Sequence, residues 1–310
     1  MVLKRTAQDA SFLVLGFAIV AGFVFPSVLT LFHPWTTLFL QIIFFFSSLK
    51  IDLHHLSQEF SHWKTLVAVS AFRLLLAPLV AVGVAAMVAP EMLMPLLLLG
   101  AMPAGMTSPL FVEMLAGNIP LSLVVTALTA LLAPLTVPLL LACFGETSLQ
   151  LPFWGMVWTL FQVIAVPFGV AQLTRFFFGK SLLSALGSRT RWFSLGALLF
   201  LVGSVTAVHR NELMESFRLD FLWYFFLLIL LFLFVHGASY YLFYWRNVRD
   251  RFTLMLSLSY MNYTLAIYLA ERYFTDAHQI LLVVLSFIPW NLGLILLQFF
   301  WPTKNVAQKF

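Results

Sequence analysis

The sequence has few charges, a single cysteine and no long polar stretch. Only 9% of its 310 residues are charged and 62% are hydrophobic, whereas soluble domains carry about 25% charged residues. The lone Cys143 excludes an internal disulfide framework and a clustered thiolate metal site. The net charge of +5 comes without a Lys/Arg-rich tract interleaved with aromatics, which argues against a nucleic-acid partner. These absences favour one integral membrane domain over residues 1–310.

Long apolar runs fill the chain instead. Runs of about 20 residues, the length that crosses a hydrocarbon core of about 30 Å, recur from end to end. The first run follows a basic head as in a signal peptide, but no A-x-A cleavage pattern follows it, so we expect it to be kept as a helix. The sequence predicts an all-α membrane protein with ten spans, at about 11–32, 34–50, 65–89, 92–116, 119–143, 153–178, 192–208, 221–245, 252–273 and 277–301.

The basic residues predict the orientation of these spans. With the N-terminus in the cytoplasm and the loops on alternating sides, most of the 17 lysines and arginines fall on the cytoplasmic side. Cytoplasmic loops of membrane proteins carry such an excess. We therefore expect both termini in the cytoplasm and a location in the bacterial inner membrane.

The two halves of the chain contain five predicted spans each. An odd number inverts the second half relative to the first, which predicts two inverted repeats, at about 11–143 and 153–301. The fourth span of each half carries residues that a simple lipid-spanning helix does not need. They are MPAGMTSPLFVEML in the first half and the hydroxyl- and amide-bearing residues of RFTLMLSLSYMNYTLAIYLAERY in the second. Interrupted spans in corresponding positions indicate a transporter's binding site.

Elementary backbone chemistry explains the first interruption. Pro109 lacks a backbone donor and clashes with the preceding turn, and Gly105 tolerates irregular dihedral angles. Each freed N–H or C=O costs several kcal/mol in hydrocarbon unless it finds a partner. The broken main chain is therefore expected inside the protein or beside water, where it can bind a solute or a small cation.

These segments resemble a known family. GAMPAGMTSPLFVEMLAGNIPLSLVVTALTALLAPLTVPLL is similar to the first crossover signature of the bile acid:sodium symporter family, and FTLMLSLSYMNYTLAIYLA is similar to its second crossover. The resemblance implies a ten-helix fold with a panel and a core domain, in which the discontinuous helices four and nine cross. It also implies sodium-coupled uptake of organic anions.

The resemblance also implies a cation site and shows where this chain departs from the family pattern. Its first sodium-like site would contain Ser108, Ser122, Thr126 and Ser257. Ser257 stands where the family has a glutamate, and Arg73 stands where it has a glutamine. Both changes raise the local charge, and two like charges about 4 Å apart repel by roughly 4 kcal/mol at an effective dielectric constant near 20. We therefore predict that the second sodium site is lost.

Two roles remain open for Arg73. It either replaces that second cation or clamps an acidic group of the substrate. The predicted substrate-binding residues are Arg73, Thr107, Ser108, Pro109, Asn262 and Asn291.

Two further residues are candidate proton or charge partners. Glu113 follows the first interruption by one helical turn, and it is either a titrating acid, a partner of Arg73 or a solvated helix-end residue. His236 is either a proton relay or a packed histidine.

The predicted function is secondary active transport of a small organic anion by alternating access, with no cofactor and at most one bound Na⁺. The alternative is a cation-independent or proton-coupled exporter or facilitator. An intramembrane enzyme is disfavoured because no paired acids, Ser-His dyad or metal cluster is recognisable. The sequence does not specify an oligomeric state.

Overall fold

The computed structural model describes residues 14–52, 63–144, 152–186, 189–216, 220–286, 288 and 290. These residues are almost entirely helical and contain no β-strand, which confirms the predicted all-α class. Six helical stretches are long and apolar enough to cross a membrane, and two shorter apolar helices cover Val14–Val24 and Pro90–Ala101. The six stretches are Pro26–Ser48, Trp63–Val88, Ile119–Phe144, Phe153–Gly179, Arg189–Val208 and Leu222–Leu242. The count of ten spans stays a prediction.

The chain divides into two compact units. Unit 1 is formed by Met1–Ile51, Trp154–Phe217 and Thr264–Leu281, as far as these segments are described. Unit 2 is formed by Asp52–Phe153, Arg218–Tyr263 and Leu282–Phe310, with the same restriction. Each unit therefore combines segments from both halves of the sequence.

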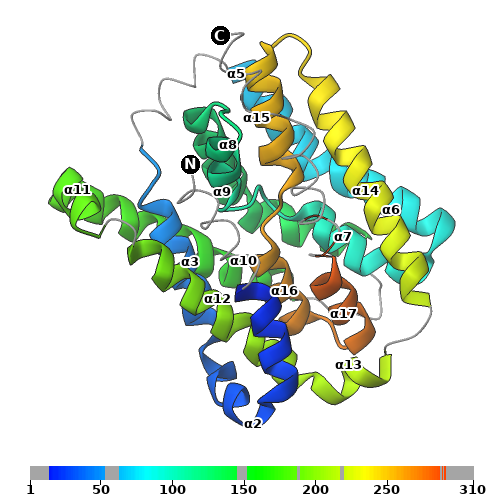
Figure 1. The fold of residues 1–310 in the computed structure, drawn as a ribbon. Coiled ribbons are helices and arrows are strands. Elements are labelled where there is room, and N and C mark those ends of the chain that lie inside the picture. The colour runs from blue at the N-terminus through cyan, green and yellow to red at the C-terminus, as the bar shows by residue number, and fades with distance from the viewer. Residues whose placement is uncertain are drawn as a thin grey trace. The chain divides into compact units, whose positions relative to one another are not determined.

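Unit 1 is built around three helices that lie side by side (Figure 1): α12 runs along α3 and contacts α2, and α11 also runs along α3. Its elements are α2 (Pro26–Leu29), η1 (Thr30–Trp35), α3 (Thr36–Ser48), α10 (Phe153–Leu160), η5 (Phe161–Ala165), α11 (Val166–Leu186), α12 (Arg189–Val208), α13 (Arg210–Ser216), α16 (Tyr263–Tyr273) from Thr264, and α17 (Ala277–Leu285) up to Leu281.

Helix α16 is fixed within unit 1 by polar side chains. The hydroxyls of Thr37 and Tyr268 are hydrogen-bonded at 2.9 Å, and His33 Nε2 lies 2.8 Å from Glu271 Oε1. These contacts join α16 to η1 and α3.

Unit 2 is built around α9, which contacts α5, α7, α8 and α15; α6 runs beside α7, and α14 runs beside α15 (Figure 1). Its elements are α5 (Trp63–Ala71), η3 (Phe72–Leu76), α6 (Ala77–Val88), η4 (Pro90–Met92), α7 (Leu93–Ala101), α8 (Ser108–Met114), α9 (Ile119–Phe144), α14 (Asp220–Leu242) and α15 (Val248–Ser259). The buried residues of α9 include larger aliphatic side chains and also the small or hydroxylic residues Ser122, Thr126, Thr129 and Ala133.

Prolines move the boundary between the first two predicted spans. The first helix ends at Val24, and Pro26 and Pro34 then keep residues 26–35 in a short helix and a 3-10 turn before α3 begins at Thr36. A proline has no N–H to donate and fits a helix best in its first turn, whereas farther along it removes a hydrogen bond and favours a kink or a break. The regular helices are consequently shorter than the predicted spans 11–32 and 34–50.

Prolines also explain two wide helical turns. The π-helical turns Phe72–Leu76 and Phe161–Ala165 each end two residues before a proline, Pro78 and Pro167. A helical proline clashes with the carbonyl four residues earlier, and that carbonyl lies inside the π turn in both cases. One extra residue in the turn relieves the clash, and such π turns are frequent at functional sites.

A glycine sets the spacing between α6 and α7. A Cβ atom added to Gly100 would lie 2.7 Å from Pro78 Cα and 3.2 Å from Pro78 N. Both atoms are main chain and cannot move away separately. The close approach of the two helices therefore requires glycine at this position.

We expect the substitution Gly100→Ala to destabilise unit 2. The added methyl group overpacks a backbone contact, and such changes lower the free energy of unfolding by about 1–3 kcal/mol. The measurement is thermal unfolding of the purified protein in detergent. Gly83→Ala is the matched control, because its Cβ on neighbouring α6 meets no atom within 4 Å. Equal melting temperatures for the two variants would contradict the packing argument.

Candidate functional site

Both segments that the sequence marks as interrupted lose their helical winding. In the first half, α7 ends at Ala101 and α8 begins at Ser108, with Pro109 in its first turn. In the second half, α15 ends at Ser259 and α16 begins at Tyr263, and the unwound chain between them is visible as an orange thread (Figure 1). We call residues 102–107 the first break and residues 260–262 the second break.

The two breaks pair with each other through their main chains. The N–H of Gly105 donates to the carbonyl of Tyr260 at 2.6 Å, and the N–H of Asn262 donates to the carbonyl of Pro103 at 3.0 Å. Ala104 and Met261 face each other between these bonds as an isolated antiparallel bridge. Pairing satisfies polar groups that would otherwise be unbonded in a water-poor interior.

The close approach again depends on glycine. A Cβ atom on Gly105 would lie 2.7 Å from the carbonyl oxygen of Met261 and 2.8 Å from that of Tyr260. Helix α9 supports the first break from its other side, because the N–H of Ala104 donates to Thr129 Oγ1 at 3.1 Å. The same hydroxyl donates to the carbonyl of Val125 at 2.8 Å.

The four predicted cation ligands lie together in unit 2, and all are buried. The hydroxyls of Ser108 and Thr126 lie 3.2 Å apart, and those of Ser122 and Ser257 lie 2.7 Å apart. Ser122 and Thr126 are one turn apart on α9, so the two pairs are neighbours. Ser108 Oγ also donates to the carbonyl of Gly105 at 2.8 Å.

This hydroxyl cluster carries no formal charge. Among the described residues, no carboxylate is hydrogen-bonded to any of its four members. Hard cations such as Na⁺ bind oxygen ligands and are held more tightly where carboxylates add negative charge. The cluster offers oxygen atoms at short spacing without that charge.

Arg73 lies on the π turn η3, and only 1% of its surface is exposed. Its Nη2 donates to the carbonyl of Leu99 at 3.1 Å, near the end of α7. The normal helical donor to Leu99 would be residue 103, which is a proline without an N–H. Together with the N–H of Met102, which lies 3.4 Å from the same oxygen, Arg73 caps the carbonyl end of α7, where the helix dipole favours a cation.

Arg73 has no acidic partner in the described part of the chain. Its Nε has no hydrogen-bond partner there, and no ion pair joins it to a carboxylate. Glu113 lies exposed on α8, whereas Arg73 is buried, and their pairing stays a prediction. A buried guanidinium without a carboxylate costs several kcal/mol of free energy unless other groups compensate its charge.

The other predicted substrate residues are distributed unevenly. Asn262 belongs to the second break and is 5% exposed. Thr107 is exposed at the end of the first break, and Pro109 is half-buried. Asn291 lies outside the described residues.

His236 lies on α14 against the second break. Its Nδ1 is hydrogen-bonded to the carbonyl of Phe232 at 2.8 Å, one turn earlier in the same helix. Its ring meets that of Tyr260 edge-on, with 5.5 Å between the centroids. The residue is buried beside aromatic rings, and its Nε2 has no hydrogen-bond partner in the described part of the chain.

Several residues that support the site carry no strong sequence signal. Trp290 Nε1 donates to the carbonyl of Ser259 at 2.6 Å and so satisfies the last turn of α15. Asn118 Nδ2 donates to Asp250 Oδ1 at 2.9 Å, and the N–H of Asn118 donates to Thr253 Oγ1 at 2.7 Å. These contacts join the α8–α9 turn to α15. Asp250 also forms an ion pair with Arg246 at 2.7 Å, and its bond to the distant Asn118 is recognisable only once the fold is known.

The model of the Sodium Bile acid symporter family matches residues 37–216 of this chain. The matched segment contains Arg73, the first break and the whole of α9, and it ends before the second break.

Two curated proteins are similar to parts of this chain. The chain is 28% identical over 205 residues to the "Uncharacterized sodium-dependent transporter YocS" of Bacillus subtilis (strain 168), covering 65% of this chain and 63% of that protein. It is 29% identical over 153 residues to the "Uncharacterized protein PA2026" of Pseudomonas aeruginosa, covering 46% and 45%. The chain thus matches less than two thirds of the length of either relative.

The family match covers more than half of the chain and confirms the resemblance seen in the sequence. Symporters are membrane transporters and not enzymes, and six membrane-length helices agree with an integral membrane protein. Because the family model matches more than half of its residues, this chain belongs to the Sodium Bile acid symporter family.

Proposed function

We propose that the protein is a secondary carrier of a small organic anion and works by alternating access. The observation that carries this proposal is the pairing of two broken helices through Gly105, Tyr260, Pro103 and Asn262. Broken membrane helices are the structural feature on which carriers build substrate and ion sites. The proposal includes ten spans in two inverted repeats, one transporter domain over residues 1–310, and both termini in the cytoplasm of a bacterial inner membrane.

An anionic substrate is favoured by the charge of the site. Arg73 is buried near the first break, and the described part of unit 2 supplies it with no carboxylate. Its positive charge therefore favours anions near the broken main chain. We assign Thr107, Ser108, Pro109 and Asn262 to the substrate path, together with Asn291, which lies outside the described residues.

Of the two roles open to Arg73, we favour that of a fixed cation. Its Nη2 bonds a main-chain carbonyl at the end of α7, which is the kind of ligand that a sodium ion takes. A guanidinium placed there would occupy the second cation position permanently. Transport would then not depend on a second sodium ion.

At most one sodium ion is expected at the hydroxyl cluster of Ser108, Ser122, Thr126 and Ser257. The relative YocS is named as sodium-dependent, which supports an ion at this place. The absence of a carboxylate among these ligands instead favours the alternative, a cation-independent or proton-coupled exporter or facilitator. In a proton-coupled carrier, Glu113 and His236 are the candidate titrating groups.

Transport by the reconstituted protein tests the function itself. We expect proteoliposomes to accumulate at least one member of a panel of radiolabelled organic anions faster than empty liposomes do. Because only one cation site remains, the rate should depend on sodium hyperbolically or not at all. Sodium, potassium and proton gradients are compared at the same membrane potential. A sigmoidal dependence on sodium, as two coupled ions produce, would contradict the assignment of Arg73.

Exchanging two charges tests the fixed cation. The double variant Arg73→Gln with Ser257→Glu lowers the local charge by two units and should bind sodium more tightly than the unmodified protein, with uptake that depends more steeply on sodium. A unit charge that is added or removed about 4 Å from a bound ion changes the free energy of ion binding by roughly 4 kcal/mol at an effective dielectric constant near 20. The measurement is ²²Na⁺ binding together with uptake at varied sodium concentration.

The matched control for this exchange is Arg73→Lys with Ser257→Gln, which alters the same side chains and keeps their charges. It should bind sodium no better than the unmodified protein does. If both double variants remain folded and neither binds sodium more tightly than the unmodified protein, the proposed electrostatic role of Arg73 is wrong.

A further inference from the structure

A groove runs along the outer surface of unit 2, between α5–η3 and α9. Its volume is about 420 Å³, and its walls are almost wholly apolar. Trp63, Val67 and Leu75 line one side, and Leu128 and Leu132 line the other. Thr136 at one end keeps its hydroxyl bonded to the carbonyl of Leu132 in its own helix, at 3.2 Å. The groove therefore presents an apolar surface to a ligand, and the hydroxyl of Thr136 is already bonded within its own helix.

The groove opens toward lipid. Both of its walls belong to membrane-length apolar stretches, Trp63–Val88 and Ile119–Phe144. Val67 is 59% exposed and Leu75 is 47% exposed, so neither is covered by the rest of the chain. In a membrane the medium that meets such residues is hydrocarbon. An unfilled groove loses dispersion contacts on its open side, and a flexible acyl chain restores them.

The length of the groove matches one leaflet. Its wall on α5 and η3 runs from Trp63 to Leu75, which is about 18 Å at 1.5 Å per residue. Half of a hydrocarbon core of about 30 Å is about 15 Å. A single acyl chain that lies along the groove would thus reach from the interface to the middle of the bilayer.

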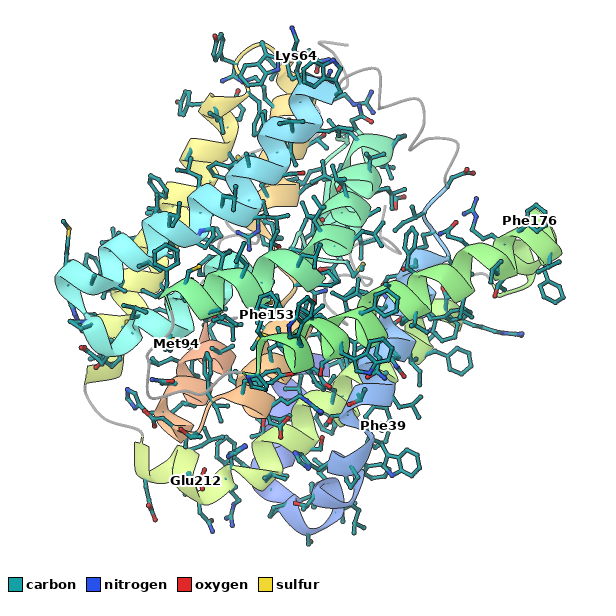
Figure 2. The ribbon with its side chains drawn as sticks, turned by 180° about the vertical axis from the view of Figure 1, so that it is seen from behind. Phe39, Lys64, Met94, Phe153, Phe176 and Glu212 are labelled. Carbon is teal, nitrogen blue, oxygen red and sulfur yellow. The ribbon has the colours of Figure 1, made fainter. Side chains whose placement is uncertain are left out.

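One end of the groove has the composition of a membrane interface. Trp63 lies there, and Lys64 Nζ is 5.9 Å from the centroid of its ring. Trp245, in the turn that follows α14, donates from Nε1 to Thr65 Oγ1 of the first turn of α5 at 3.4 Å. Figure 2 shows Lys64 at the start of α5, where its side chain extends outward. Tryptophans mark the headgroup level, and a lysine there attracts anionic lipids.

We propose that this groove binds one anionic phospholipid, with an acyl chain between α5–η3 and α9 and the headgroup phosphate at Lys64. In the orientation proposed above, the lipid belongs to the cytoplasmic leaflet. The positive charge of Lys64 at one end of the groove and the apolar walls along the rest of it fit a lipid with an anionic headgroup and an acyl chain. A second copy of the chain is the other possible occupant, and the experiment separates the two.

The lipid would also support the turn that carries Arg73. Leu74 and Leu75 of η3 line the groove, and Arg73 of the same turn bonds Leu99 inside unit 2. A bound acyl chain packs against the outer side of a π turn whose inner side holds the guanidinium. Lipid binding itself does not depend on any transported substrate, so failure of the proposed function leaves this inference intact.

Native mass spectrometry of the purified full-length protein tests the inference, with phosphatidylglycerol and phosphatidylcholine added as probes. We expect one phosphatidylglycerol molecule to stay bound under collisional activation that removes all phosphatidylcholine. Ala71→Trp, which fills the groove, should abolish this retained lipid. Lys64→Gln should weaken phosphatidylglycerol binding about fivefold and leave phosphatidylcholine unchanged.

The matched control is Ala86→Trp, which places the same side chain at an exposed position of α6 away from the groove. It should retain the lipid, and melting curves of all variants show whether they fold. Retention of the lipid by folded Ala71→Trp, or its loss in Ala86→Trp as well, would overturn the proposal. A dimer that Ala71→Trp dissociates, without any retained phospholipid, would assign the groove to a second copy instead.

Discussion

The structure of unit 2 depends on one requirement: main chain that is not helical must find hydrogen-bond partners away from water. The chain meets this requirement by bringing two breaks together, so that Gly105 and Tyr260 form one bond and Asn262 and Pro103 form the other. Each break supplies the partners of the other, and neither is stable alone in hydrocarbon. The contact needs a glycine, because a Cβ atom at position 105 would meet two carbonyl oxygens. The side-chain site is assembled around this contact.

One buried positive charge, without a described carboxylate beside it, determines the electrostatics of this site. The hydroxyls of Ser122 and Ser257 satisfy each other at 2.7 Å, and no described carboxylate joins them. Arg73 supplies a buried positive charge at the carbonyl end of α7 instead. A helix dipole compensates only about half an elementary charge. The remaining positive field favours an anion and opposes a second sodium ion, which is why we propose anion transport with reduced sodium coupling.

The sequence predicts the parts of this site that depend on local chemistry. Pro109 and Gly105 mark the first break because they act on their own backbone, and the hydroxyls on α9 share a face because of their spacing. The second break has no proline or glycine to mark it in the sequence. Hydrogen bonds from Trp290 and from the first break hold its main chain in a non-helical conformation instead. The bond from Arg73 to Leu99 was not predictable, because it joins side chain and main chain across the fold. Asn291 lies outside the described residues, so its role stays a prediction.

A disulfide between the breaks tests the central claim most directly. Ala104 and Met261 are opposed in an antiparallel bridge, where Cα atoms lie about 4.5–5.5 Å apart, within the range that a disulfide spans. With the exposed Cys143 replaced by serine, Ala104→Cys combined with Met261→Cys leaves two cysteines for the test. After mild oxidation in membranes and proteolysis, we expect mass spectrometry to detect two peptides, one with position 104 and one with position 261, joined by a disulfide. Recovery of both cysteines as free thiols in folded protein would contradict it.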